Sequence, residues 1–247
     1  MYRGRFVFSN VIRFAAAAVL ILSLGACGGG SSDGSGFVVG APMQQLDGAW
    51  FGSLEDPVGG LHTYQVTVSG DAVSQILIDG VDQGLTGTIT KESDVLFSLV
   101  LSDGAEAGFI VDAAVQHAVF VDDSFNFAVV QKGVSGLPVF LVNDVDGNWS
   151  GNTIITDFVI SSEFASTASC TNLLCTASGN GVNASIDLSG SFDATFGQWA
   201  GTFNNSAGES GVARALLSAD KLFAGSYTCD NAGSFPDACD FSAWVRQ

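Results

Sequence analysis

The sequence predicts an all-β protein with two tandem antiparallel units of about eight strands each. The run Asp47–Gly52 (Asp-Gly-Ala-Trp-Phe-Gly) returns 99 residues later as Asp146–Gly151 (Asp-Gly-Asn-Trp-Ser-Gly), and similarity at a fixed offset indicates duplicated units. Each copy opens a series of short segments with alternating or continuous apolar character that end at Gly, Asp, Asn or Ser, a pattern typical of strands joined by tight turns. No long helical periodicity follows residue 26.

Residues 1–26 have the composition of a signal peptide. Arg3, Arg5 and Arg13 form a positive region, and Ala15 to Leu24 form an apolar stretch of about ten residues. Such a stretch is too short to span a bilayer but suits a cleaved export signal.

The next residues, Leu24-Gly25-Ala26-Cys27, resemble the lipobox of bacterial lipoproteins. The resemblance implies cleavage before Cys27 and acylation of its sulfur and amine, for example with palmitate. Several acyl chains anchor a protein far more firmly than one. Residue 28 is Gly and not Asp, which in this family implies the outer membrane, at its periplasmic face or the cell surface. An ordinary signal peptide with a chance Cys is the alternative.

Residues 27–46 form the predicted flexible tether, which is rich in Gly and Ser. Its Gly30-Ser31-Ser32-Asp33-Gly34 matches the nucleophile-elbow pattern by composition, but no strand precedes it and no helix follows. The two β units are expected at 47–142 and 143–247.

The mature chain is strongly acidic. All 25 acidic residues lie after residue 26, against five basic ones, which gives a formal charge of −20. Nucleic acid is therefore not expected as a partner, because phosphate binding needs clustered Lys and Arg. A solvated acidic surface and attraction of a cation or basic partner are both consistent with this charge.

Four cysteines remain besides Cys27, and an even number in an oxidising compartment predicts two disulfides. Three pairings exist; we favour Cys170 with Cys175 and Cys229 with Cys239, since each would join a local hairpin. A zinc site competes, but the spacing differs from C-x₂-C and no His lies in this half.

The strand segments can be assigned in order. In the first unit they are Trp50–Glu55, His62–Ser69, Ala72–Asp79, Leu85–Lys91, Val95–Leu101, Glu106–Ala113, Gln116–Val121 and Phe125–Lys132. Pro138 allows at most an edge strand at Val139–Val142. In the second unit they are Trp149–Thr156, Asp157–Ala165, Ala168–Ser178, Val182–Ser189, Ser191–Phe196, Gln198–Asn204, Gly211–Ala219, Lys221–Cys229 and Ala238–Arg246.

Eight sequential strands hide their edges by closing into an up-and-down barrel. The first strand carries Gly-x-Trp and the last a basic residue in both units: Gly48 and Trp50 with Lys132, and Gly147 and Trp149 with Arg246. This combination resembles the calycin group of lipocalins and avidins. The resemblance implies that Trp50 and Trp149 close one barrel end and that the basic side chain packs across each. The Gly- and Phe-rich run 203–211 also resembles lipid-anchored barrels of transferrin-binding-protein type. Two open sandwiches would give the same strand pattern.

Few residues suggest chemistry. His117 precedes Asp122, Asp123 and Ser124, but a triad is recognised by geometry, and a single His on a strand more often packs or faces solvent. The run 143–148 has a calcium-loop composition without the EF-hand pattern, and a turn uses the same residues. No catalytic residue, metal or cofactor is therefore predicted.

The expected function is that of a non-catalytic lipoprotein anchored in the outer membrane. The 19 Phe and four Trp either fill cores or line an apolar cavity. We expect a small apolar ligand or an envelope protein as partner. A cell-envelope hydrolase and a purely structural envelope protein are the alternatives.

Overall fold

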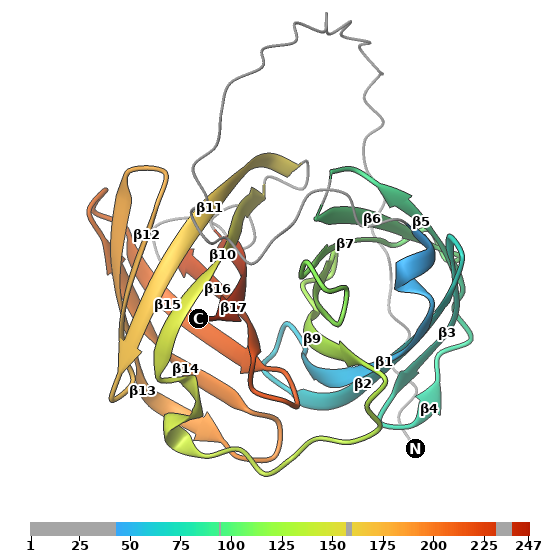
Figure 1. Ribbon diagram of the computed structural model, residues 1–247, viewed down its shortest axis with the longest axis horizontal. Helices are drawn as coiled ribbons and strands as arrows, with labels where there is room; N and C mark the ends of the chain where they lie inside the picture. Colours follow the sequence, from blue (N-terminus) through green and yellow to red (C-terminus); the bar gives the residue numbers. More distant parts are fainter. Residues whose placement is uncertain (1–42, 94, 157–159, 231–238) are drawn as a thin grey trace, which may run out of the picture. The chain divides into compact units, whose positions relative to one another are not determined.

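The computed structural model describes residues 43–247 except 94, 157–159 and 231–238, without the side chains of 43–44, 154–156 and 160–163. The predicted signal peptide, Cys27 and most of the tether lie outside the described residues. The fold is all-β, with two closed eight-stranded antiparallel barrels in tandem, as predicted (Figure 1). The described residues include no helix long and apolar enough to cross a lipid bilayer.

The first barrel is coloured blue to green in Figure 1. Its strands are β1 (Gly48–Glu55), β2 (Leu61–Ser69), β3 (Ala72–Ile78), β5 (Gly87–Lys91), β6 (Leu96–Leu101), β7 (Glu106–Val111), β8 (His117–Asp122) and β9 (Phe127–Lys132). The short β4 (Val81–Asp82) pairs only with β3. The ring closes because β1 pairs with β9, while β3 meets β5 through only two residue pairs.

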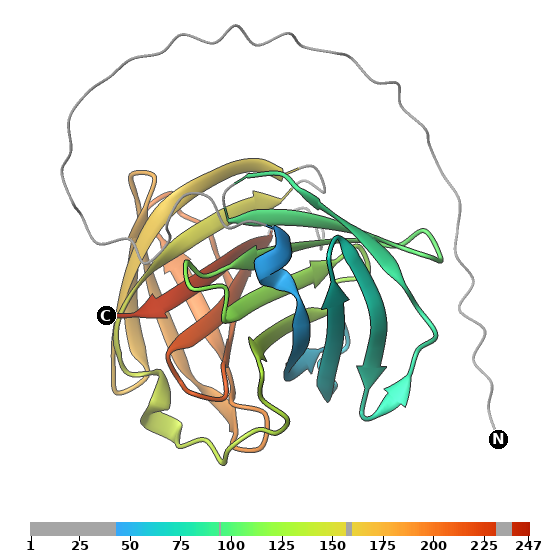
Figure 2. The ribbon, with the colours of Figure 1, turned by 45° about the vertical axis from the view of Figure 1, so that its right-hand side comes forward.

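The second barrel is coloured yellow to red, and Figure 2 shows its strands from a second direction. They are β10 (Gly147–Thr156), β11 (Ile160–Thr171), β12 (Leu174–Gly179), β13 (Val182–Asp193), β14 (Gln198–Asn205), β15 (Ser210–Leu217), β16 (Phe223–Asp230) and β17 (Cys239–Arg246). Each strand pairs with the next, and β10 pairs with β17. Closed rings exclude the open sandwiches that the sequence left as an alternative.

Two pairs of strand assignments need correction. The segments Val182–Ser189 and Ser191–Phe196 form one strand, β13, whose pairing with β14 shifts register between Asp187 and Ser191. Gly190 lies within this irregular stretch of β13 and does not form a turn. The segments expected at Asp157–Ala165 and Ala168–Ser178 instead form β11 and β12, with the turn between the two cysteines. The segment Val139–Val142, for which Pro138 allowed at most an edge strand, is a loop that enters a 3₁₀ turn.

The repeated Asp-Gly-x-Trp-x-Gly motif builds the same barrel end twice. A 3₁₀ turn precedes each copy: η1 (Met43–Leu46) and η2 (Val142–Val145). The buried indole of Trp50 donates a hydrogen bond to the Leu46 carbonyl (2.9 Å), and that of Trp149 to the Val145 carbonyl (3.0 Å). The motif therefore fixes a turn across one end of each barrel.

The basic side chains on the last strands complete these ends. Lys132 Nζ lies 5.7 Å from the Trp50 ring centroid, and Arg246 Cζ lies 4.6 Å from the Trp149 centroid. A cation over an indole face is attracted by the ring quadrupole. Two eight-stranded barrels with this closure fit a calycin-like barrel fold.

The other motif residues have backbone roles. The first Gly of each copy, Gly48 and Gly147, has φ of +132° and +142°, a region that L side chains rarely adopt. The carboxylate of Asp146 accepts hydrogen bonds from the amides of Asn172 and Leu173 at 3.0 and 3.1 Å, and that of Asp47 accepts one from Gly70. Each Asp thus caps the turn between the second and third strands of its barrel.

The two barrels belong to one compact unit and share an apolar interface. Val119, Phe127 and Val129 on β8 and β9 cluster with Phe223 and Phe241 on β16 and β17. A Cβ on Gly225 would lie 2.5 to 2.9 Å from side chains of β8 and β9, so this position needs Gly for the close approach. The outer faces of β16 and β17 are therefore buried against the first barrel.

Candidate ligand-binding cavity of the second barrel

The interiors of the two barrels can be compared position by position. Trp50 pairs with Val66 on β2 and Lys132 on β9; Trp149 pairs with Ala168 on β11 and Arg246 on β17. Because both tryptophans sit at the same register in the same topology, each inward position of one barrel has a counterpart in the other.

The counterparts differ in size. Counting from the tryptophans, Leu54 matches Thr153. Tyr64, which pairs with Gly52, matches Ser166, which pairs with Gly151. Counting from the last strands, Phe120 opposite Ala128 matches Ser226 opposite Ser242, and Phe109 matches Ala215. At these four positions the second barrel carries small side chains where the first carries bulky ones, whereas Trp244 takes the place of Val130.

This difference decides which barrel is hollow. Leu54, Tyr64, Phe109 and Phe120 all belong to the apolar core that fills the first barrel, with Phe109 and Phe120 stacked at 4.8 Å between ring centroids. The second barrel instead holds a cavity of about 420 Å³. Ligand sites in proteins typically measure about 300–1,000 Å³. The cavity is the candidate functional site.

The cavity is lined by both polar and apolar side chains. Five hydroxyl side chains from β10, β11, β16 and β17 and a set of apolar side chains from β11, β13, β14 and β17 line it. The hydroxyls are Thr153, Ser166, Ser226, Thr228 and Ser242, and the main apolar residues are Phe164, Val182, Ile186, Phe203 and Trp244. A ligand with a polar and an apolar part matches this division.

The hydroxyls are ordered by one another. Thr153 Oγ1 lies 2.9 Å from Ser166 Oγ and 2.8 Å from Ser242 Oγ, and all three residues are buried. The indole of Trp244 donates to Ser226 Oγ at 2.8 Å. Since a hydroxyl has one donor and two acceptor lone pairs, this network keeps capacity for a ligand.

Three carboxylates complete the lining: Glu209 before β15, Asp230 at the end of β16 and Asp240 on β17. Burial, and secondarily the negative charge of Glu209, raises the pKa of Asp240 to about 6. Within the part of the chain that the structure describes, no hydrogen bond reaches the Asp240 carboxylate. The sequence could not single out Asp240, because its position follows only from the register of β17.

The histidine that the sequence singled out has a different role. His117 lies at the inter-barrel interface, with Nδ1 2.8 Å from Asp112 Oδ2 and Nε2 2.9 Å from Asp220 Oδ2. Its ring stacks on Phe223. These partners are not the Asp122, Asp123 and Ser124 considered from the sequence, so the imagined triad is not assembled.

The charge of His117 is well stabilised. Burial by itself lowers the pKa of His117, but the hydrogen bonds and negative charges of Asp112 and Asp220 outweigh it and raise the pKa to about 9. Burial likewise opposes ionisation of Asp220, yet the hydrogen bonds from His117 and Ser218 lower its pKa to about 2. An imidazolium held between two carboxylates links β8 to the loop before β16.

A second polar cluster joins the barrels at Glu55, which is buried at the end of β1. One carboxylate oxygen accepts from Tyr227 Oη at 3.1 Å and lies 3.4 Å from Arg214 Nε; the other accepts from Gln198 Nε2 at 3.1 Å. All three partners belong to the second barrel. These contacts supply partners for the buried carboxylate of Glu55 and hold β14, β15 and β16 of the second barrel against β1.

The run 143–148, considered for calcium, has its carboxylates engaged elsewhere. Asp144 pairs with Lys221 Nζ at 2.6 Å, and Asp146 caps the turn described above. Among the described residues, no group of three or more His, Cys, Asp and Glu could hold a metal ion.

The favoured cysteine pairs lie at disulfide distance. Cys170 and Cys175 face each other across β11 and β12 with an S–S distance of 2.08 Å, and Cys229 and Cys239 across β16 and β17 with 2.03 Å. Cys239 also lines the cavity, so the second pair fastens two cavity strands together.

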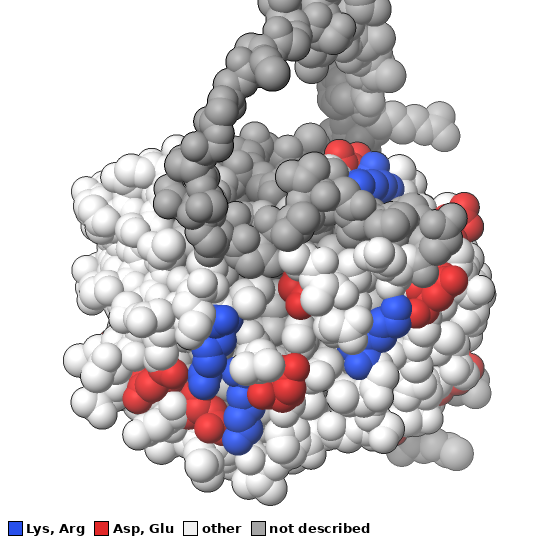
Figure 3. Space-filling view, in the orientation of Figure 1, with Lys and Arg blue, Asp and Glu red and all other residues white. Residues whose placement is uncertain are grey.

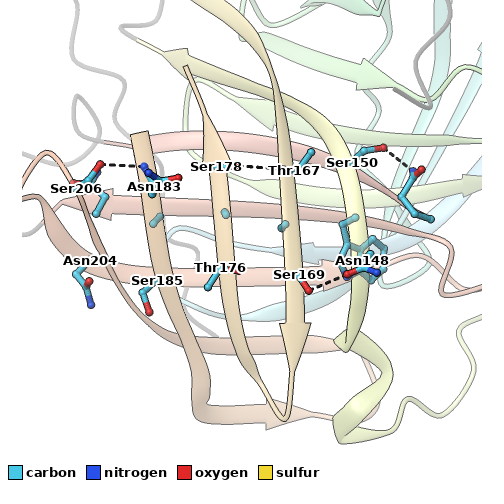
Figure 4. A pocket seen from close by; sticks show the side chains of 16 residues that line it. Asn148, Ser150, Thr167, Ser169, Thr176, Ser178, Asn183, Ser185, Asn204 and Ser206 are labelled. Atoms are coloured by element: carbon cyan, nitrogen blue, oxygen red, sulfur yellow. Dashed lines mark hydrogen bonds between the residues drawn. The ribbon is translucent and has the colours of Figure 1, made fainter. Parts of the chain in front are cut away.

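Two further surfaces lie on the outside of the barrels. On the outer face of β10–β14, small hydroxyl and amide side chains form two rows, one running from Asn148 through Ser169, Thr176 and Ser185 to Asn204 (Figure 4). The area over β12 shows no charged side chain in Figure 3. Some neighbours within these rows bond to one another, as Ser169 does to Asn148 at 2.9 Å and Thr167 to Ser178 at 3.0 Å.

The other surface is a groove of about 410 Å³ on the outside of β6–β8. Its floor is apolar, and carboxylates surround it. The floor includes Leu96, Ile110, Val119 and Val121, and the acidic residues are Glu92, Glu106, Asp122 and Asp123.

Comparison with known proteins adds little beyond this geometry. No family model and no curated protein matches the chain. Among solved structures, the chain is similar to a protein of unknown function from the DUF3598 family of Nostoc punctiforme PCC 73102. The identity is 13%, the TM-score is 0.34, and the match covers 83% of this chain and 97% of the other.

Proposed function

We propose that the protein is a non-catalytic, lipid-anchored lipoprotein of the outer membrane whose second barrel binds a small ligand. The observation that carries the binding role is the replacement of Leu54, Tyr64 and Phe120 by Thr153, Ser166 and Ser226 at matching inward positions. These replacements open a cavity of about 420 Å³ in a barrel of otherwise similar plan. A cavity lined by both hydroxyl and aromatic side chains suits a ligand with a polar end and an apolar body.

A binding role is favoured over hydrolysis because of where the candidate catalytic groups lie. Thr153, Ser166 and Ser242 bond to one another, and Ser226 accepts a hydrogen bond from an indole, whereas a hydroxyl nucleophile needs an adjacent general base. His117 is engaged by two carboxylates at the interface, and neither it nor His62 lines the cavity.

Refilling the cavity tests the binding role. Ser166→Tyr copies Tyr64, and Ser226→Phe copies Phe120, so each inserts a side chain that the first barrel accommodates at the matching position. The wild type should bind the neutral fluorescent probe N-phenyl-1-naphthylamine at one site, and both variants should bind it at least tenfold more weakly. Thr167→Tyr is the matched control, because Thr167 neighbours Ser166 on β11 but is exposed. Unchanged binding in folded Ser166→Tyr and Ser226→Phe proteins would refute the cavity as the site.

The anchor is tested separately. The support for it is the sequence Leu24-Gly25-Ala26-Cys27, which lies outside the described residues. Cys27→Ser should move the protein from the outer-membrane fraction to the soluble periplasmic fraction. If the variant still fractionates with membranes, lipidation is not what retains the wild type.

A protein partner is the second candidate function, and the groove on β6–β8 favours it. An apolar floor between Glu92, Glu106, Asp122 and Asp123 complements a segment with alternating apolar and basic residues. An alternating Leu-Lys peptide should bind the wild type more tightly than Glu106→Gln/Asp123→Asn. Asp187→Asn/Asp193→Asn removes the same charge from the second barrel and should leave binding unchanged. Equal loss in both double variants would mean non-specific attraction only.

A further inference from the structure

We propose that the cavity of the second barrel selects an organic cation, with an amine or ammonium head and an apolar body. The inference rests on the binding function proposed above and names the chemical class of its ligand. Three observations support it: the negative charge of the cavity lining, the carboxylate of Asp240, and the aromatic side chains in the lining.

The cavity is lined by charge of one sign. Glu209, Asp230 and Asp240 contribute carboxylates, and the described residues that line it include no Lys or Arg. Low-dielectric walls focus the field of such groups into the space between them. An anionic ligand would be repelled, whereas a cation would be attracted before it makes any contact.

Asp240 has no counterion of its own. Its side chain is partly buried, and within the described part of the chain no hydrogen bond reaches its carboxylate. Its pKa, raised to about 6 by burial and by Glu209, shows the cost of holding this charge. A ligand cation beside Asp240 would remove that cost, because an opposite charge favours the ionised carboxylate.

The first barrel lacks this feature. Counting from Lys132 and Arg246, the counterpart of Asp240 is Asn126, whose side chain donates a hydrogen bond to Asp122 at 2.7 Å. The filled barrel thus has a neutral, bonded amide where the hollow barrel has an unmatched carboxylate. The charge accompanies the cavity, which links it to binding and not to the shared barrel plan.

The rest of the lining suits the body of an organic cation. Phe164, Phe203 and Trp244 supply apolar surface, and aromatic faces attract ammonium groups. A bare metal ion would need several oxygen ligands converging on one point. Among the described residues no group of three or more such side chains that could hold a metal ion exists, which favours an organic cation over a metal.

The test compares three probes of similar size and different charge: 2-phenylethylammonium, 2-phenylethanol and phenylacetate. Isothermal titration at pH 7.5 and 150 mM salt should give at least tenfold tighter binding for the cation than for the alcohol, and weakest binding for the anion. The cation's affinity should rise as the pH increases through about 6, because Asp240 then ionises while the probe stays protonated.

Substitutions locate the effect. Asp240→Asn should weaken binding of the cation by about tenfold, a loss of about 1.4 kcal/mol, and leave binding of the alcohol unchanged. Glu209→Gln should act in the same direction. Asp187→Asn is the matched control, since Asp187 lies exposed on β13 and does not line the cavity.

The outcomes separate this inference from the proposed function. Equal affinities for cation and alcohol, or unchanged cation binding in Asp240→Asn, would overturn the selection of cations while leaving a ligand-binding cavity. Failure of all three probes and of N-phenyl-1-naphthylamine to bind would overturn both.

Discussion

His117, whose imidazolium lies between Asp112 and Asp220, should make the protein less stable at alkaline pH. The folded state raises the pKa of His117 to about 9 from its ordinary 6.5. A group whose pKa is raised by folding stabilises the fold fully below its unfolded pKa and loses this effect as the pH passes its folded pKa. One pKa unit corresponds to about 1.4 kcal/mol, so the wild type should lose about 3 kcal/mol of unfolding free energy between pH 6.5 and 9.5.

His117→Gln should abolish this loss, because glutamine does not titrate. Urea unfolding at pH 6.5, 8 and 9.5, followed by circular dichroism, measures the difference. The variant leaves Asp112 and Asp220 without their cation, so its stability should be lower than that of the wild type, and the test compares the slopes with pH. His62→Gln is the matched control: His62 pairs with Asp79 at 2.7 Å on a more exposed site, so this variant should keep most of the alkaline loss. A slope in His117→Gln equal to that of the wild type would refute the reasoning.

Three further predictions follow from the barrel ends and the interface. Trp50→Ala and Trp149→Ala should each cost about 3–5 kcal/mol, measured by urea unfolding, because each leaves a large void beneath its 3₁₀ turn; losses below 1 kcal/mol would contradict a closing role. Non-reducing peptide mapping should recover both cysteine pairs as local disulfides, and free thiols or crossed pairs would overturn that pairing. A fragment of residues 143–247 should show β-rich circular dichroism, since its ring closes through its own strands, but should self-associate where β16 and β17 lose their cover; an unfolded fragment would mean that the barrels form one folding unit.

The duplicated plan could be predicted from the sequence because its signals are local. The Asp-Gly-x-Trp-x-Gly motif carries its own turn, anchor and close approach within six residues, and strands such as Leu61–Ser69 alternate clearly. The segment Val182–Ser189 shows the predicted alternation, with Val182, Ala184 and Ile186 more buried than the polar residues between them. The strand merger at Gly190 was missed because a glycine signals a turn and an irregular pairing equally well.

The site could not be predicted because it depends on register. No local pattern marks Ser166 as the counterpart of Tyr64; the match appears only when each is seen opposite a motif glycine on the first strand. His117 and Asp220 are 103 residues apart and meet only through the packing of two barrels. The sequence therefore indicated two similar barrels but could not say that the second one holds a cavity.

β16 and β17 connect the cavity of the second barrel with the apolar interface to the first barrel. Their inward side chains, including Ser226, Asp240 and Ser242, line the cavity. Their outward side chains, including Tyr227 and Phe241, pack on Phe127 of the first barrel at 5.1 and 6.0 Å between ring centroids. Binding groups are positioned best when their supporting elements are rigid. A barrel with small side chains around a cavity has less internal packing to support these strands. The filled first barrel packs against β16 and β17 from outside and so supports the strands that line the cavity. The polar contacts of Glu55 and His117 with the second barrel add to this support.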